Sequence, residues 1–163
     1  MQNNRDDSIQ SKAALAGHPI HPMLIAFPIA FLIGMLVADV VYLISEDTFW
    51  ARVSFWSGVA GIVTGLVSAV FGAIDFIGLR PVRQFKAAWI HVLGNIAALS
   101  LATINILLRM DNAATPIPGW GIALSGIVTL LLSITGWYGG ELSYRHRVGV
   151  MRKIHTSASG EPQ

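Results

Sequence analysis

The sequence contains no cysteine and few charged residues. Charged side chains make up 12% of the 163 residues, whereas soluble proteins average about a quarter. Without cysteine the chain has no disulfide, no thiolate metal site, no cysteine-ligated iron–sulfur cluster and no c-type haem attachment. The Gly-x-Ser-x-Gly nucleophile elbow and the phosphate-binding Gly-Lys-Ser/Thr loop are also missing, which argues against the enzymes that use them. A net charge of +2 gives no argument for a nucleic-acid partner.

What the sequence has instead is four long apolar segments. Each reaches the roughly 20 residues that an α-helix needs to cross the hydrocarbon core of a membrane. The segments run over residues 23–44, 53–79, 87–108 and 119–138. Asp39 and Asp75 are the only Asp, Glu, Lys or Arg residues inside them. Because the links between segments are short, we expect antiparallel neighbours and an all-α, up-down-up-down bundle of four transmembrane helices in a lipid bilayer.

The basic residues predict the orientation of the bundle. Nine of the eleven Lys and Arg residues lie on the side that holds both termini and the middle link, and only Arg52 and Arg109 lie on the other. The positive-inside rule therefore predicts cytoplasmic N- and C-termini. We divide the chain into a disordered N-terminal segment (1–16), a four-helix transmembrane domain (17–150) and a basic and polar C-terminal tail (151–163).

Small residues recur at helical spacing in three of the four segments. In membranes such residues let helices approach closely, so we expect them on the faces between helices. They are Ala26, Ala30, Gly34 and Ala38 in the first segment, Gly61, Gly65, Ser68 and Gly72 in the second, and Gly126, Thr129, Ser133, Gly136 and Gly140 in the fourth.

All five histidines fall on the side predicted to be cytoplasmic. His18 and His21 stand in a His-Pro-x-His-Pro stretch where the first segment begins, and His91 lies four residues into the third. The prolines stiffen the backbone that carries the first two, which is what a metal or haem ligand requires. His146 and His155 lie among arginines and lysines, and we interpret both as a solvated flank near anionic lipid.

Asp75 and Asn95 extend the polar group at this end. Asp75 and His91 each lie about 6 Å inside the same interface at 1.5 Å per residue, and Asn95 is one turn deeper than His91. Ionisable residues inside a membrane segment face the bundle interior or water and are functional candidates by default. Asp75 can equally form a structural pair with His91 or Arg80.

Further ion pairs are expected outside this group. Asp39, near the opposite interface, has Arg52 and Arg109 as possible partners. Glu141 and Arg145 are spaced i,i+4 and can pair if the fourth helix continues through the two glycines before them, which otherwise mark its end.

Several motifs resemble those of a known family. The stretch Gly-His-Pro-Ile-His-Pro-Met at 17–23, followed by Phe-Pro-Ile-Ala at 27–30, is similar to the opening signature of small bacterial inner-membrane proteins filed as domain of unknown function 2231. Asp75, the pair His91 and Asn95, and the segment 139–150 resemble later parts of that pattern. The resemblance implies four helices in a bacterial inner membrane and no established activity. Some relatives stand beside iron–sulfur redox domains, which favours electron transfer.

Our first hypothesis is a b-type haem protein that carries electrons. Histidines on facing helices of a bundle commonly fill both axial positions of a haem. His21 and His91 are the expected axial ligands, and the position of His21 at the interface, which makes the haem shallow, is the weakness of the hypothesis. Arg80 and Arg83 would meet the propionates. The full set of expected haem-binding residues is His18, His21, Arg80, Arg83, His91 and Asn95.

The second hypothesis is a divalent transition-metal site without haem. Its expected ligands are His18, His21, Asp75 and His91, whose imidazole and carboxylate groups suit zinc, iron or copper. Asp75 separates the two hypotheses, because a metal site would use it as a ligand, whereas a bis-histidine haem would use it only to orient an imidazole or not at all. A third hypothesis is a cofactor-free structural or accessory subunit. In each case we expect a redox partner, another membrane subunit or a second copy as partner, and a carrier or accessory protein rather than an enzyme.

Overall fold

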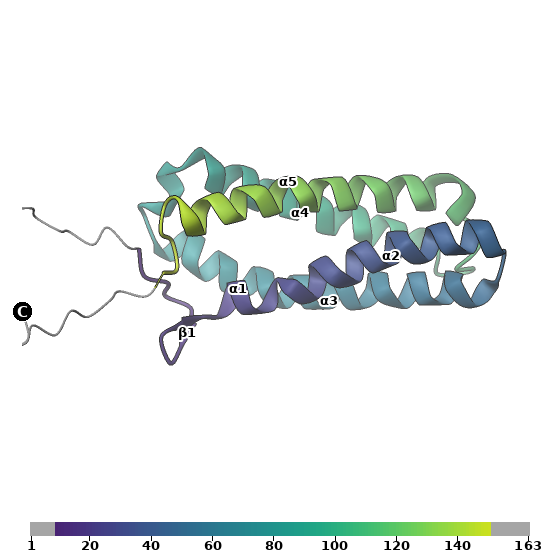
Figure 1. Ribbon diagram of the computed structural model, residues 1–163, viewed down its shortest axis with the longest axis horizontal. Helices are drawn as coiled ribbons and strands as arrows, with labels where there is room; N and C mark the ends of the chain where they lie inside the picture. Colours follow the sequence, from purple (N-terminus) through teal and green to yellow (C-terminus); the bar gives the residue numbers. More distant parts are fainter. Residues whose placement is uncertain (1–8, 151–163) are drawn as a thin grey trace, which may run out of the picture.

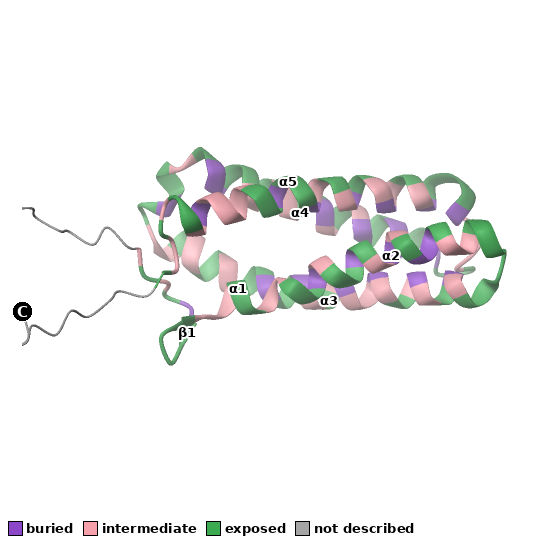
Figure 2. Ribbon diagram, viewed as in Figure 1, coloured by how far each residue is buried: buried purple, intermediate pink, exposed green. Residues whose placement is uncertain are grey.

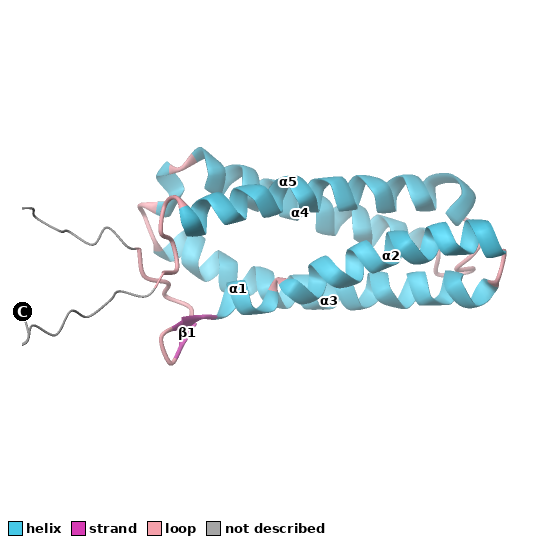
Figure 3. Cartoon of the chain, viewed as in Figure 1, coloured by secondary structure: helices cyan, strands magenta, loops and turns pink. Residues whose placement is uncertain are grey.

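The protein is an elongated bundle of four antiparallel helical spans (Figure 1). The computed structural model describes residues 9–150. The spans are Ile20–Ser45, Thr48–Gly78, Lys86–Leu108 and Ile117–Tyr144, and each is long and apolar enough to cross a membrane. Figure 3 shows that helices make up most of this part of the chain. The prediction of an all-α four-helix membrane bundle is therefore confirmed.

The first span is divided into two helices, α1 (Ile20–Leu24) and α2 (Ala26–Ser45). Pro28 explains the break, because it has no N–H to donate to the carbonyl of Leu24 and its ring crowds that carbonyl. Pro22 is tolerated inside α1 because it lies in the first turn. The short α1, which carries His21, is joined to α2 through Ile25 and packs against the helix that follows α2.

The helix α3 (Thr48–Gly78) follows α2 after only two residues. Glu46 ends α2 with a left-handed φ of 55°. Asp47 caps α3, since its side chain accepts a hydrogen bond of 2.8 Å from the N–H of Phe49. Arg52, expected in the link, therefore lies inside α3. With 31 residues, about 46 Å, α3 exceeds the thickness of the hydrocarbon core and must tilt or project from it.

The second half of the chain forms another helical hairpin. The 3₁₀ turn η1 (Val82–Gln84) leads into α4 (Lys86–Leu108), and the π-type turn η2 (Ile117–Gly121) leads into α5 (Ile122–Tyr144). The helix α5 runs through Gly139 and Gly140, so these glycines are not a helix end. The expected pair forms, with Arg145 Nη1 3.1 Å from Glu141 Oε1.

The N-terminal segment folds across the end of the bundle. The two-residue strands β1 (Ala14–Leu15) and β2 (His18–Pro19) pair antiparallel, and a parallel bridge joins Ile9 to Val148. The prediction of disorder is thus wrong for residues 9–16, because their backbone groups find partners on the bundle. Figure 1 shows both ends of the described chain meeting there. Residues 1–8 and the tail 151–163 lie outside the described residues.

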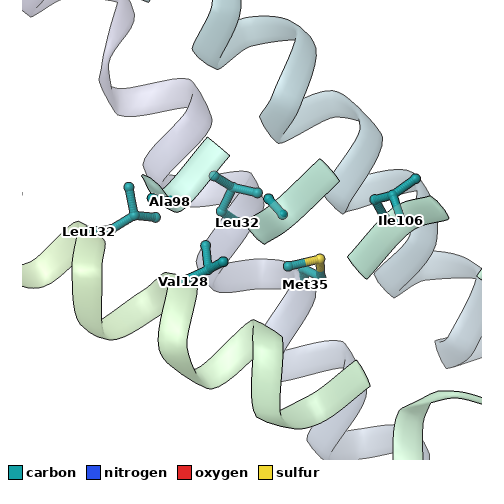
Figure 4. Packing of buried hydrophobic residues seen from close by; sticks show 7 residues of the cluster. Leu32, Met35, Ala98, Ile106, Val128 and Leu132 are labelled. Atoms are coloured by element: carbon teal, nitrogen blue, oxygen red, sulfur yellow. The ribbon is translucent and has the colours of Figure 1, made fainter. Parts of the chain in front are cut away.

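Buried apolar residues form two clusters at different levels of the bundle. Figure 4 shows the larger one, and Figure 2 shows how sparsely buried residues are distributed among exposed ones. The larger cluster is Leu32, Met35, Ala98, Ala102, Ile106, Val128 and Leu132. The smaller cluster, at the end with the chain termini, is Val82, Ala87, Ala88 and Leu142. Along α4 and α5, His91 and its neighbours lie between these two apolar clusters.

The small-residue faces are confirmed only for α3. Gly61 lies against the side chain of Leu32, and Gly65 against that of Leu99. Ala30 is instead exposed, and a Cβ added at Gly126 or Gly136 would have no atom within 4 Å. A glycine face on one helix needs a large side chain from its neighbour, and α2 and α5 supply several such side chains. Of the predicted small residues on α2, Ala38 is buried as expected. The other buried residues of α2 and α5 are Pro28, Leu32, Met35, Asp39, Ser125, Val128, Leu132, Thr135 and Leu142.

Candidate functional site

His21 of α1 and His91 of α4 come together inside the bundle. Their ring centroids are 6.0 Å apart and the ring planes are perpendicular, at 90°. Both side chains are half-buried. The two histidines belong to different halves of the chain, which are 70 residues apart in sequence, so the folded bundle creates the pair.

The same nitrogen of each ring is held by a backbone carbonyl. Nδ1 of His21 donates to the carbonyl of Ser68 in α3 at 2.9 Å, and Nδ1 of His91 donates to the carbonyl of Thr135 in α5 at 2.8 Å. Ser68 Oγ lies 3.1 Å from the same nitrogen of His21. Because a carbonyl oxygen only accepts, Nδ1 carries the proton and Nε2 of each neutral ring keeps its lone pair. In metal-bound histidines the ring nitrogen that does not bind the metal commonly donates such a hydrogen bond.

The ring of His21 lies beside α3, about two to three turns before the end of that helix. It contacts Ser68 and Gly72, which are ten and six residues before the end of α3, or about 15 and 9 Å along the helix. The polar residues that precede His21 fold over this end of the bundle, so His21 lies beneath them.

Three glycines create the room around the pair. A Cβ added at Gly72 would lie 3.0 Å from Nδ1 of His21, and one added at Gly139 would lie 2.9 Å from Cε1 of His91. At Gly94 an added Cβ would collide with the Thr135 methyl group, so α4 and α5 pack closely beside the site. The contact between His91 and Gly139 explains why α5 carries glycine there without ending.

Asn95 supports the backbone and the neighbouring helix rather than the rings. Its Nδ2 donates to the carbonyl of His91 at 2.7 Å, and its Oδ1 accepts a weak hydrogen bond of 3.4 Å from Thr135 Oγ1. Asn95 therefore joins α4 to α5 one turn beyond His91, and its expected place beside His91 is correct.

His18 and Asp75 lie apart from the pair. His18 is exposed, and its Nδ1 is 3.1 Å from the carbonyl of Ala16. The Asp75 carboxylate accepts hydrogen bonds from Ser11 Oγ at 2.6 Å and from the backbone N–H groups of Lys12 and Ala13 at 2.7 and 3.1 Å. The folded N-terminal segment, which the sequence did not predict, thus occupies this carboxylate in place of the expected partners, His91 and Arg80. Across residues 9–150, no three His, Asp or Glu side chains gather to hold a metal.

Three further residues considered from the sequence, Arg80, Arg83 and His146, lie at the end of the bundle that holds the chain termini. Arg80 and Arg83 are exposed in the link between α3 and α4. His146 is not a solvated flank, since it is half-buried and its ring stacks on Phe85 with centroids 4.0 Å apart. Its Nε2 lies 4.0 Å from Glu141 Oε1. His155, which we also interpreted as part of a solvated flank, lies outside the described residues.

A second polar cluster is buried at the opposite end of the bundle. Arg109 and Asp39 are 1% and 0% exposed and form a two-pronged ion pair, with N–O distances of 2.7 and 2.8 Å. Arg109 is therefore the partner of Asp39, and Arg52 is exposed on α3. Three further buried polar side chains complete the hydrogen bonds of the pair: Ser54, Asn105 and Ser125. This cluster connects α2, α3, α4 and α5 and leaves neither charge unpaired.

Comparison with known proteins places the chain in a family. The family model described as "predicted membrane protein (DUF2231)" matches residues 17–152. The chain belongs to this family. The match covers all four helical spans and both histidines of the pair. No curated protein and no solved structure matches the chain. The family description states a membrane protein and no activity, so any function must be argued from the site.

Proposed function

We propose that the protein is a b-type haem electron carrier in which His21 and His91 are the two axial ligands. The spacing of the rings is the observation that carries this proposal. An imidazole nitrogen binds a metal at about 2 Å, so two nitrogens on one iron are about 4 Å apart. Each ring centroid lies about 1 Å behind its nitrogen, which gives about 6 Å between centroids. The centroids of His21 and His91 are 6.0 Å apart.

The hydrogen bonds of the rings support the same assignment. Each Nδ1 is engaged by a backbone carbonyl of a different helix, which fixes the ring orientation and leaves Nε2 as the ligand atom. Haem bound in this way would supply one-electron exchange between ferric and ferrous iron. With both axial positions filled by protein, oxygen has no vacant coordination position, which favours a carrier over an oxygen-activating enzyme.

The surroundings of the pair suit an anionic, planar group. Arg80 and Arg83 are exposed at the nearer end of the bundle and would bind the propionates. Gly136, next to Thr135 on α5, is exposed, and an added Cβ there would have no atom within 4 Å. In our proposal this end faces the cytoplasm of a bacterium, from the excess of basic residues around it, and meets a redox partner there.

The contacts of Asp75 favour haem over a non-haem metal site. A metal held by His18, His21, Asp75 and His91 would need the carboxylate, which is engaged by three hydrogen bonds to residues 11–13. Two histidines alone give too few ligands for a typical zinc site, which has at least three from protein. Two axial ligands are sufficient for haem, because the porphyrin supplies the other four.

The proposal is tested by purifying the protein in mild detergent and recording its visible spectrum, oxidised and dithionite-reduced, before and after adding haem. A Soret band with sharp reduced α and β bands is expected, and His18→Ala is expected to leave it unchanged. A protein that gives no spectral shift on titration with haem contradicts the proposal. Metal analysis of the same sample then separates a non-haem site from a cofactor-free accessory subunit.

A further inference from the structure

The N-terminal strap, residues 9–19, is tied to the bundle chiefly by one carboxylate. Asp75 lies in the last turn of α3 and accepts from Ser11 Oγ, Lys12 N and Ala13 N at 2.6 to 3.1 Å. Three hydrogen bonds of this length converging on one carboxylate form a strong tether between the strap and α3. A second tether joins the start of the strap to the end of the chain, with Gly149 N donating to the carbonyl of Ile9 at 2.8 Å.

The strap leads directly to the first histidine of the pair. Ala13 is buried, at 7% exposure, and its carbonyl accepts a hydrogen bond of 2.9 Å from the N–H of Ile20, the first residue of α1. The chain between them reverses direction at Ala16 and Gly17, both with positive φ. His21 is the next residue after Ile20. A short path of hydrogen bonds therefore runs from Asp75 through Ala13 to the backbone that carries His21.

The helix α1 is short, with five residues, and a turn at Ile25 marks its junction with α2. The N–H of Ile25 donates to the carbonyl of His21 at 3.1 Å, so the backbone of α1 continues into α2 at this end. At its other end α1 is held by packing on α3, by the hydrogen bond of the His21 ring to Ser68 and by the strap.

We propose that Asp75 is a positioning residue for His21, acting through the strap. This inference rests on the proposed haem function and names how one of its two ligands is held. Asp75 touches neither ring and binds no metal in this scheme. Its hydrogen-bonding capacity, and not its charge, is what the strap requires.

Two substitutions of Asp75 separate a requirement for its hydrogen bonds from a requirement for its charge. Asp75→Ala removes all three hydrogen bonds, so His21 should dissociate from the iron easily. Asp75→Asn keeps an acceptor oxygen for the two backbone N–H groups and a donor for Ser11, so it should retain the ligand. Glu141→Ala is the matched control, because Glu141 is a half-buried carboxylate at the same end that pairs with Arg145 instead.

The experiment measures carbon monoxide binding to the dithionite-reduced, haem-loaded protein in detergent. The Asp75→Ala variant should bind carbon monoxide at least about tenfold more readily than wild type, because it loses all three hydrogen bonds that hold the strap to α3. The Asp75→Asn and Glu141→Ala variants should behave like wild type. An Asp75→Ala variant that stays six-coordinate and unreactive, or an Asp75→Asn variant that matches Asp75→Ala, overturns the inference.

A haem-free measurement distinguishes failure of this inference from failure of the proposed function. Since the chain has no cysteine, Leu15→Cys, at a strap position 71% exposed, takes a single spin label. The label should become markedly more mobile in Asp75→Ala and not in Asp75→Asn. If wild type binds no haem but the label responds in this way, the anchoring stands and only the haem role fails. A label that is equally mobile in all variants refutes the anchoring itself.

Discussion

At the residue scale, glycines shape the histidine site as much as the histidines do. Gly72 and Gly139 each stand where a methyl group would lie about 3 Å from an imidazole atom. Without them, α3 and α5 would push the rings away from the carbonyls that hold them. The geometry of the two histidines therefore depends on glycines, which have no side chain.

Gly139→Ala should weaken haem binding about tenfold, because overpacking of a close-packed site typically costs about 1–3 kcal/mol. The added methyl group would lie 2.9 Å from Cε1 of His91 and tilt the ring away from Thr135. Haem titration measures the affinity. Gly126→Ala is the control, on the same helix with open space around it and away from both histidines. Equal affinity in the two variants would show that the contact with Gly139 is unimportant.

The sequence predicted the two histidines but not their hydrogen-bond partners. His21 and His91 stand out because imidazoles are rare in membrane segments. Ser68 and Thr135 act through backbone carbonyls, which every residue has, so their side chains gave no signal for this role. The tie between Asp75 and residues 11–13 was missed for a similar reason, since two of its three donors are backbone N–H groups.

At the scale of elements, local breaks decide where the site lies. The sequence located all four spans, since length and hydropathy suffice for that. The break between α1 and α2 was not predicted, although Pro28 explains it, and the proposed support of α1 by the strap depends on tertiary contacts that the sequence does not show. The small-residue faces failed on α2 and α5 because spacing alone does not say which of two neighbouring helices supplies the large side chains.

The helices are joined at the far end by the Asp39–Arg109 cluster, and we expect Arg109→Leu to destabilise the protein by about 3–5 kcal/mol. The substitution leaves the Asp39 carboxylate buried without its counter-charge. Detergent-to-SDS unfolding titrations measure this loss. Arg52→Leu is the control, because Arg52 is an exposed arginine on the same side.

The double variant Asp39→Leu/Arg109→Leu tests the reason for the loss. It should be more stable than Arg109→Leu alone, since no unpaired charge remains in the interior. If Arg109→Leu costs no more than Arg52→Leu, the cluster does not hold the helices together.

At the scale of the whole molecule, the two ends of the bundle are built differently. The far end has a fully paired ionic cluster and the larger apolar cluster next to it. The other end has the histidine pair, the strap and most of the described basic residues. A rigid end and a polar end that faces a partner are what the proposed electron carrier requires.

We predict the orientation of the bundle from its basic residues, and a labelling experiment checks that prediction. In intact bacterial cells, Leu15→Cys should be protected from a membrane-impermeant maleimide, while Met110→Cys should be labelled. Leu15 and Met110 are 71% and 67% exposed at opposite ends of the bundle, and the chain has no other cysteine. The reverse pattern would place the histidine end outside the cytoplasm.

The central claim is that one haem binds between His21 and His91. Low-temperature electron paramagnetic resonance of the oxidised protein, loaded with one equivalent of haem b, tests it most directly. Because the rings are perpendicular, two iron d-orbitals should be nearly degenerate, and the account predicts a single, strongly anisotropic low-spin signal. His21→Ala and His91→Ala should each abolish that signal. A high-spin signal in wild type, or a low-spin signal that survives both substitutions, would contradict the account.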